Sequence, residues 1–286
     1  MIVAFSHFTL SEVDARLASQ PSLSEVYSLL YFTLARKAYA RNLQYRGAHM
    51  VHNVASALFG YLYACIWIGI GEGRSLGEYG TQGMVSYIAF TQASLWVTSF
   101  LTNGLGIPES VRTGHISMDL MRPVHLFTHL MSREWGQILY QFLYKSIPIY
   151  LVYLIAFKLR LPENGMTYVL TTASLFGATY MGICINYLIG VTAMWTTESS
   201  WLQWANHALV NLLAGFFIPI EWLPKILQTI AWWSPYPYLL YVPTRIYLGY
   251  EDGSLLLGTM VWVLLLTLIC YLATYYLRRK VEVQGG

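Results

Sequence analysis

Six apolar segments, each near the length of about 20 residues that a helix needs to cross a bilayer, dominate this chain. They are expected at His52–Ile70, Met84–Gly106, Gly136–Phe157, Tyr168–Met194, Trp204–Ile218 and Leu255–Leu277. The composition agrees, because 56% of the 286 residues are hydrophobic and only 11% are charged, against about 25% charged in ordinary soluble domains. The sequence therefore predicts an all-α integral membrane protein with six transmembrane helices.

The passage that follows the fifth segment is apolar but too broken to cross a bilayer. Prolines interrupt it at positions 219, 224, 235, 237 and 243. Backbone of this kind is tolerated at membrane depth only where protein or a water-filled cavity covers it. We therefore expect a re-entrant helical element here. Its turn, an outer gate, is expected to comprise Phe216, Phe217, Pro219, Glu221 and Pro224.

The rest of the chain adds a short N-terminal part to this six-span domain, residues 50–280. Residues 1–24 are unpatterned and are expected to form a flexible extension, and residues 281–286 a C-terminal tail. Residues 25–49 combine helical apolar spacing with basic residues, which predicts an amphipathic helix in the membrane interface. A short soluble helix remains the alternative.

The basic residues near the segment ends predict the orientation, because cytoplasmic loops carry an excess of Lys and Arg. One side would carry ten of them: Arg36, Lys37, Arg41, Arg46, Arg112, Arg122, Arg133, Arg278, Arg279 and Lys280. The other side would carry five: Arg74, Lys158, Arg160, Lys225 and Arg245. We therefore expect both termini in the cytoplasm.

Several kinds of chemistry find no support in the sequence. None of the 14 acidic residues falls inside the six segments, although ion-coupled carriers generally need ionisable groups there. The three cysteines show neither metal-ligand nor disulfide spacing. There is no phosphate-binding loop and no catalytic constellation, and a charge of +3 is too small to indicate a nucleic-acid partner. We expect no enzyme, metal or cofactor site, so another subunit would supply any energy.

A few polar side chains inside the segments are candidates for a substrate path. They are Gln92, Trp96, Thr98, Lys145 and Asn186. The alternative for Lys145 is a structural one, in which the side chain extends to the interface or bonds to neighbouring hydroxyls. Asn186 shares a helix face with Ala178, Gly182 and Gly190. Small residues at this spacing predict close contact with another helix.

The loop between the second and third segments is the most polar loop on the predicted cytoplasmic side. Its centre mixes charged and apolar residues, and Pro123 interrupts it. A short helix here would present Arg112, Asp119, Met121 and Arg122 to a partner. A solvated connector between two spans is the alternative.

Gly114 to Pro123 reads GHISMDLMRP, and a later stretch reads AGFFIPIEWLP. Both resemble type-2 ATP-binding-cassette exporter permeases, in particular the small six-span branch of bacterial multidrug or antibiotic export systems. The resemblance covers roughly Arg36 to Lys280. The loop residues that carry it are Gly114, Ile116, Leu120, Arg122 and Pro123.

The resemblance implies a permease dimer in the bacterial inner membrane, made of two identical or related subunits and working by alternating access. Separate ATPase subunits would bind ATP and Mg. The amphipathic N-terminal helix would act as an elbow, and the loop as a coupling helix on the ATPase, through Arg112, Gly114, Ile116, Asp119, Leu120, Met121, Arg122 and Pro123. A non-transporting scaffold or sensor, or a channel-like subunit, stays open as the rival interpretation.

Overall fold

The computed structural model describes residues 23–44, 46–196 and 198–284, and these form helices and turns without any strand. The predicted all-α class is confirmed. The expected N-terminal extension lies almost wholly outside the described residues. Five described helices are long and apolar enough to cross a membrane: His49–Gly73, Gly80–Arg112, Leu126–Phe157, Gly165–Thr196 and Leu256–Leu277.

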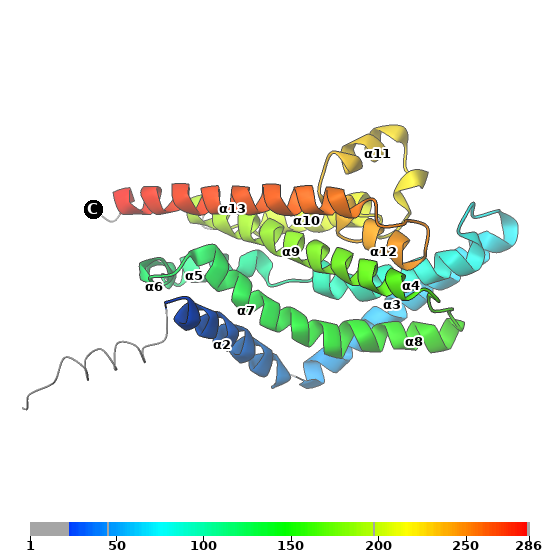
Figure 1. Ribbon diagram of the computed structural model, residues 1–286, viewed down its shortest axis with the longest axis horizontal. Helices are drawn as coiled ribbons and strands as arrows, with labels where there is room; N and C mark the ends of the chain where they lie inside the picture. The colour runs from blue at the N-terminus through cyan, green and yellow to red at the C-terminus, as the bar shows by residue number, and fades with distance from the viewer. Residues whose placement is uncertain (1–22, 45, 197, 285–286) are drawn as a thin grey trace, which may run out of the picture.

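The helices follow one another with short connections (Figure 1). They are α2 (Leu23–Leu43), α3 (Arg46–Gly73), α4 (Gly80–Thr98), α5 (Ile107–Arg112), α6 (Ile116–Met121), α7 (Leu126–Gln141), α8 (Ile147–Phe157), α9 (Gly165–Thr196), α10 (Ser200–Leu213), α11 (Lys225–Trp232), α12 (Tyr241–Tyr247) and α13 (Leu256–Gln284). Three 3-10 turns are η1 (Asn103–Gly106), η3 (Ile220–Trp222) and η4 (Tyr236–Tyr238), and the π-turn η2 (Phe142–Ser146) joins α7 to α8.

The central helix of the fold is α4. Its apolar stretch is 89% buried, whereas those of α3 and α13 are each 17% buried and leave broad apolar surfaces. Helix α9 packs directly against the α4 region through the small residues expected to make a helix contact. A Cβ added to Gly182 would lie 2.1 Å from the carbonyl oxygen of Thr98, and one added to Gly190 would lie 2.1 Å from that of Gly104. The predicted close contact is confirmed.

The fifth predicted segment is not a full-length span. Helix α10 has 14 residues, fewer than the about 20 needed to cross a bilayer. It ends before Gly215, whose φ of +73° is a left-handed conformation that favours glycine. The Tyr87 hydroxyl donates a hydrogen bond to the Gly215 carbonyl oxygen, which fixes the turn against α4.

Helix α2 lies along α7, at the end of the molecule that also holds α5, α6 and the C-terminal end of α13 (Figure 1). The contact is close, because a Cβ on Gly136 of α7 would lie 1.9 Å from the Ala35 carbonyl oxygen. The predicted end of this helix, at residue 49, is corrected. It ends at Leu43, and Arg46 already begins α3.

Helix α7 begins at Leu126 rather than at Gly136, so the long helix that runs on through η2 and α8 contains Arg133 and Glu134. Glu134 is 1% exposed, and its carboxylate accepts a hydrogen bond of 2.8 Å from the Thr102 backbone N–H. The expectation that no carboxylate lies within these segments is thereby corrected. A buried carboxylate that is bonded in this way holds the end of α4 against α7.

Candidate functional site

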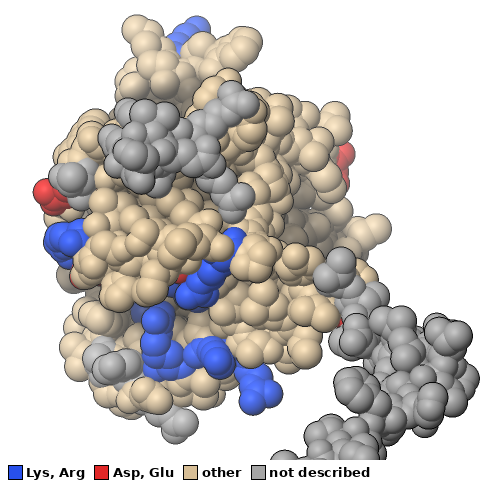
Figure 2. All heavy atoms as spheres, turned by 90° about the vertical axis from the view of Figure 1, so that its left-hand side faces the viewer, with Lys and Arg blue, Asp and Glu red and all other residues tan. Residues whose placement is uncertain are grey.

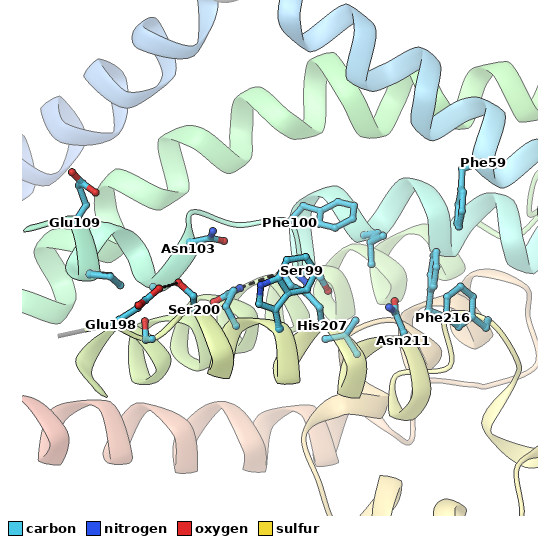
Figure 3. A pocket seen from close by; sticks show the side chains of 18 of the residues that line it. Phe59, Ser99, Phe100, Asn103, Glu109, Glu198, Ser200, His207, Asn211 and Phe216 are labelled. Carbon is cyan, nitrogen blue, oxygen red and sulfur yellow. Dashed lines mark hydrogen bonds between the residues drawn. The ribbon is translucent and has the colours of Figure 1, made fainter. Parts of the chain in front are cut away.

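A cleft of about 850 Å³ runs between α4 and α10 (Figure 3). One wall comes from α4 and the residues that follow it, the other from α10, and α3 contributes at one end. The lining residues are Phe59, Gln92, Leu95, Ser99, Phe100, Asn103, Gly104, Pro108, Glu109, Arg112, Glu198, Ser199, Ser200, Gln203, Trp204, His207, Val210, Asn211, Phe216 and Phe217. No described group of three or more His, Cys, Asp or Glu could hold a metal ion.

The chemical character of the cleft changes along its length. Figure 3 shows Glu109 and Glu198 at one end and Phe59 and Phe216 at the other. Amide, imidazole and aromatic side chains line the space between them. The cleft therefore suits molecules that combine an apolar ring or chain with polar groups.

The predicted gate residues are divided between the apolar end of the cleft and the surface behind it. Phe216 and Phe217 line the cleft, and Phe217 stacks on Tyr63 of α3 with ring centres 5.2 Å apart. Pro219 is buried, whereas Pro224 is exposed at the start of α11. Glu221 points away into an ionic cluster that is described below.

Of the five predicted substrate-path residues, only Gln92 lines the cleft. Asn186 is buried on α9 and accepts a hydrogen bond of 3.1 Å from Gln203, which is a cleft residue. Thr98 is buried and bonds to its own helix at the Ser94 carbonyl oxygen. Asn186 thus holds part of the wall in place, and Thr98 lies behind it.

Trp96 and Lys145 form a separate pair on the α3 side of α4. The Lys145 ammonium lies 3.8 Å from the centre of the Trp96 ring. The Trp96 indole N–H and the Gln92 amide both donate to the Ser56 hydroxyl, at 3.1 and 3.0 Å. This bond network connects the pair to the cleft wall at Gln92.

The predicted coupling loop consists of two short helices rather than one. Helix α5 ends at Arg112, which pairs with Glu109, and the chain turns at Gly114 with a φ of +76°. The Ser110 hydroxyl donates to Asp119 at 3.2 Å and so ties α5 to α6. These bonds make α5 and α6 one folded unit.

This unit has a packed face and an exposed face. Ile116 and Leu120 pack against the core, and Asp119 is half-buried and lies 3.5 Å from Arg122. Five of the residues predicted to contact a partner are exposed: Arg112, Gly114, Met121, Arg122 and Pro123. Glu109, Thr113, His115, Ser117 and Met118 are exposed beside them. Met121 is 77% exposed, the most of any residue in the unit's apolar set.

An ionic cluster at the opposite end has Arg245 at its centre. The Arg245 guanidinium contacts Glu78 before α4, Glu221 of η3 at 3.0 Å and Glu251 after α12 at 3.6 Å. Burial, and then the hydrogen bond with Glu221, raise the pKa of the Tyr79 phenol well above its usual value, so it remains a donor to that carboxylate. Sequence reasoning missed this cluster, because its members are scattered along the chain.

The sequence matches the family model described as ABC-2 family transporter protein over residues 56–281. A comparison with curated proteins found no match. The matched region contains the whole cleft, the α5–α6 unit and the Arg245 cluster, and it extends over most of the chain. This chain therefore belongs to the ABC-2 transporter family and is a multi-pass membrane permease.

Proposed function

We propose that the chain is the permease subunit of an ATP-driven exporter. Separate ATPase subunits would hold ATP and Mg, and the chain would line the path of the cargo. The cleft between α4 and α10 is half of that path. In this proposal the protein lies in a bacterial inner membrane with both termini in the cytoplasm.

One observation supports this proposal above all others: α5 belongs both to the cleft and to an exposed unit. Pro108, Glu109 and Arg112 line the cleft, and the same short helix is bonded to α6, which exposes Met118 and Met121. A partner that pushes on α6 therefore moves the polar mouth of the cleft. Exposed methionines beside charged residues suit a protein partner.

The basic residues at this same end support the proposed orientation. Figure 2 views the molecule from the end that holds α5 and α6, and Lys and Arg gather there. Arg36, Lys37 and Arg41 of α2 are exposed. Excess basic charge indicates the cytoplasmic side, where α2 would act as an elbow in the interface and α5–α6 as the coupling unit.

A second permease subunit would complete the path. The cleft is flanked by apolar side chains that the single chain leaves exposed, including Leu58 and Leu62 of α3 and Trp201 and Trp204 of α10. A facing subunit would cover them and close the cleft. Helix α10 together with the re-entrant elements η3 to α12 would then serve as the sixth passage.

Alternating access is the mechanism that we propose for these parts. Closure of the ATPase subunits would push α5 and α6, the packed pair of α4 and α9 would move as a rigid body, and Phe216 and Phe217 would open or seal the outer end. The rival is a membrane scaffold or sensor that moves no cargo. The large cleft favours transport, because a scaffold needs no such cavity.

The decisive experiment reverses one exposed charge on the coupling unit, in Arg122→Glu. We expect the variant to remain in the membrane at normal levels but to lose ATPase stimulation and transport at least about tenfold, because two like charges at positions 119 and 122 would distort the docking surface. Lys225→Glu, an exposed charge reversal at the opposite end, is the matched control. Normal transport by Arg122→Glu would contradict the docking assignment. A wild-type complex with an ATPase but no cargo movement would favour the rival.

A further inference from the structure

Lys145 is a buried cation without an acidic partner. It lies in the π-turn η2 and is 4% exposed. Its ammonium contacts the face of Trp96 and lies near enough to His49 to repel a charge there. None of the ion pairs among the described residues includes Lys145. The adjacent Ser146 hydroxyl is also buried and without a hydrogen-bond partner.

This arrangement is costly unless something else binds there. Removing an unpaired ion from water carries a desolvation penalty, and contact with an aromatic face offsets that penalty only in part. Ionisable residues within spans generally mark functional sites, and single π-turns concentrate at such sites too. An anion beside the ammonium would offset the remaining cost.

The pair lies directly behind the cleft wall. The Trp96 ring is 4.9 Å from the ring of Phe100, a cleft residue. Its indole N–H shares the Ser56 hydroxyl with Gln92, which also faces the cleft. The Trp96 ring therefore contacts both Lys145 and a residue of the cleft wall. A change of its side-chain rotamer is the movement that would bring the Lys145 ammonium to the cleft.

We propose that Lys145 is an oxyanion subsite of the cleft, covered by Trp96. Its ligand is the carboxylate, sulfonate or phosphate of an amphipathic molecule whose apolar part lies against the aromatic lining. That molecule enters from the cleft as cargo, or it is an anionic lipid whose phosphate reaches the same ammonium. Naming the ligand as cargo rests on the proposed export function, but the anion site itself does not.

The test compares two fluorescent probes that differ in one charge. Anilinonaphthalene sulfonate carries the oxyanion, and phenylnaphthylamine has the same rings without it. Each is titrated into the full chain in phosphatidylcholine nanodiscs, with empty discs subtracted. We expect Lys145→Met to weaken the sulfonate probe about tenfold or more, as for a lost charged hydrogen bond, and to leave the neutral probe unchanged. Lys145→Arg retains the charge and should retain binding.

Lys225→Met removes an exposed lysine and is the matched control, which should bind both probes as wild type does. Equal effects of Lys145→Met on both probes, or an effect on neither, would overturn the proposal. If that variant does not fold, Trp96→Ala provides a second test. Removal of the ring that covers Lys145 in this proposal should strengthen binding of the sulfonate probe relative to binding of the neutral one. No such relative gain would also overturn it.

The source of the oxyanion is distinguished by adding phosphatidylglycerol to the discs. Competition with the sulfonate probe in wild type, but not in Lys145→Met, supports the subsite with a lipid as its occupant. An unchanged difference between the two proteins supports the subsite with cargo as its occupant. These titrations need no ATPase subunit, so they can fail while the Arg122→Glu experiment succeeds, and the reverse.

Discussion

At the scale of single residues, Arg245 holds together the end of the molecule opposite α5 and α6. Its side chain is 11% exposed and faces three carboxylates, which come from three separate segments. Tyr79 adds a further hydrogen bond, at 3.1 Å from the guanidinium. Because one guanidinium balances three acidic groups, its removal leaves mutual repulsion as well as lost bonds.

We expect Arg245→Gln to lower the free energy of unfolding by about 2 kcal/mol, near the middle of the range for hydrogen bonds to charged groups. The partial exposure of the glutamates keeps the cost from being larger. Thermal unfolding of the purified chain in detergent measures this loss of stability. High salt should reduce the difference in melting temperature between the variant and wild type, because salt screens the repulsion among the remaining carboxylates. Arg160→Gln, at an exposed arginine, is the control, and equal melting temperatures would contradict the structural importance of Arg245.

At the scale of helices, α4 and α9 behave as one packed element. Gly182 and Gly190 of α9 approach backbone carbonyl groups so closely that no side chain fits between. The connection at Gly104 continues directly into α5 through η1. We therefore expect a displacement of α5 to displace α9 as well.

Gly190→Ala tests this contact. The new Cβ would meet the Gly104 carbonyl oxygen at 2.1 Å, so the backbones must separate, at a cost of about 1 to 3 kcal/mol for an overpacked site. We expect a lower melting temperature and weaker coupling of ATPase activity to transport. Gly69→Ala places its Cβ in open space and should be neutral or slightly stabilising, since alanine favours helix. Similar melting temperatures for both variants would show that the contact is looser than described.

Much at this scale could be predicted from the sequence, because apolar length and small-residue spacing are local signals. They located five long helices and the face of α9 that carries Gly182 and Gly190. They did not show that α7 starts at Leu126, because the polar start of that helix reads as loop. They also could not place Lys145 against Trp96, because local signals do not show how α4 and η2 pack together.

At the scale of the whole molecule, the cleft has one side that this chain does not close. Apolar surfaces of α3 and α10 flank it, and their side chains include Leu58 and Trp204. Individually exposed apolar residues are ordinary in lipid, but here they border a polar cavity. This placement is what the proposed dimer explains.

Trp204→Cys in a Cys65→Ser background tests the dimer, since Cys65 is itself an exposed thiol on α3. We expect oxidation to form a cross-link between two copies, seen as a doubled mass on a non-reducing gel. Leu264→Cys, on the exposed side of α13, should cross-link far less because that face is expected to contact lipid. Equal cross-linking at both sites would indicate random collisions and contradict the assigned interface.

The ionic cluster of Arg245 also sets an order for biosynthesis. Glu78 and Arg245 are separated by 167 positions, and a chain is made and inserted from its N-terminus. Glu78, in the loop before α4, therefore lacks its Arg245 partner until nearly the whole protein has been translated. Chains that stop before α12 leave this loop open, and a quality-control protease that cuts exposed loops would distinguish them from finished ones.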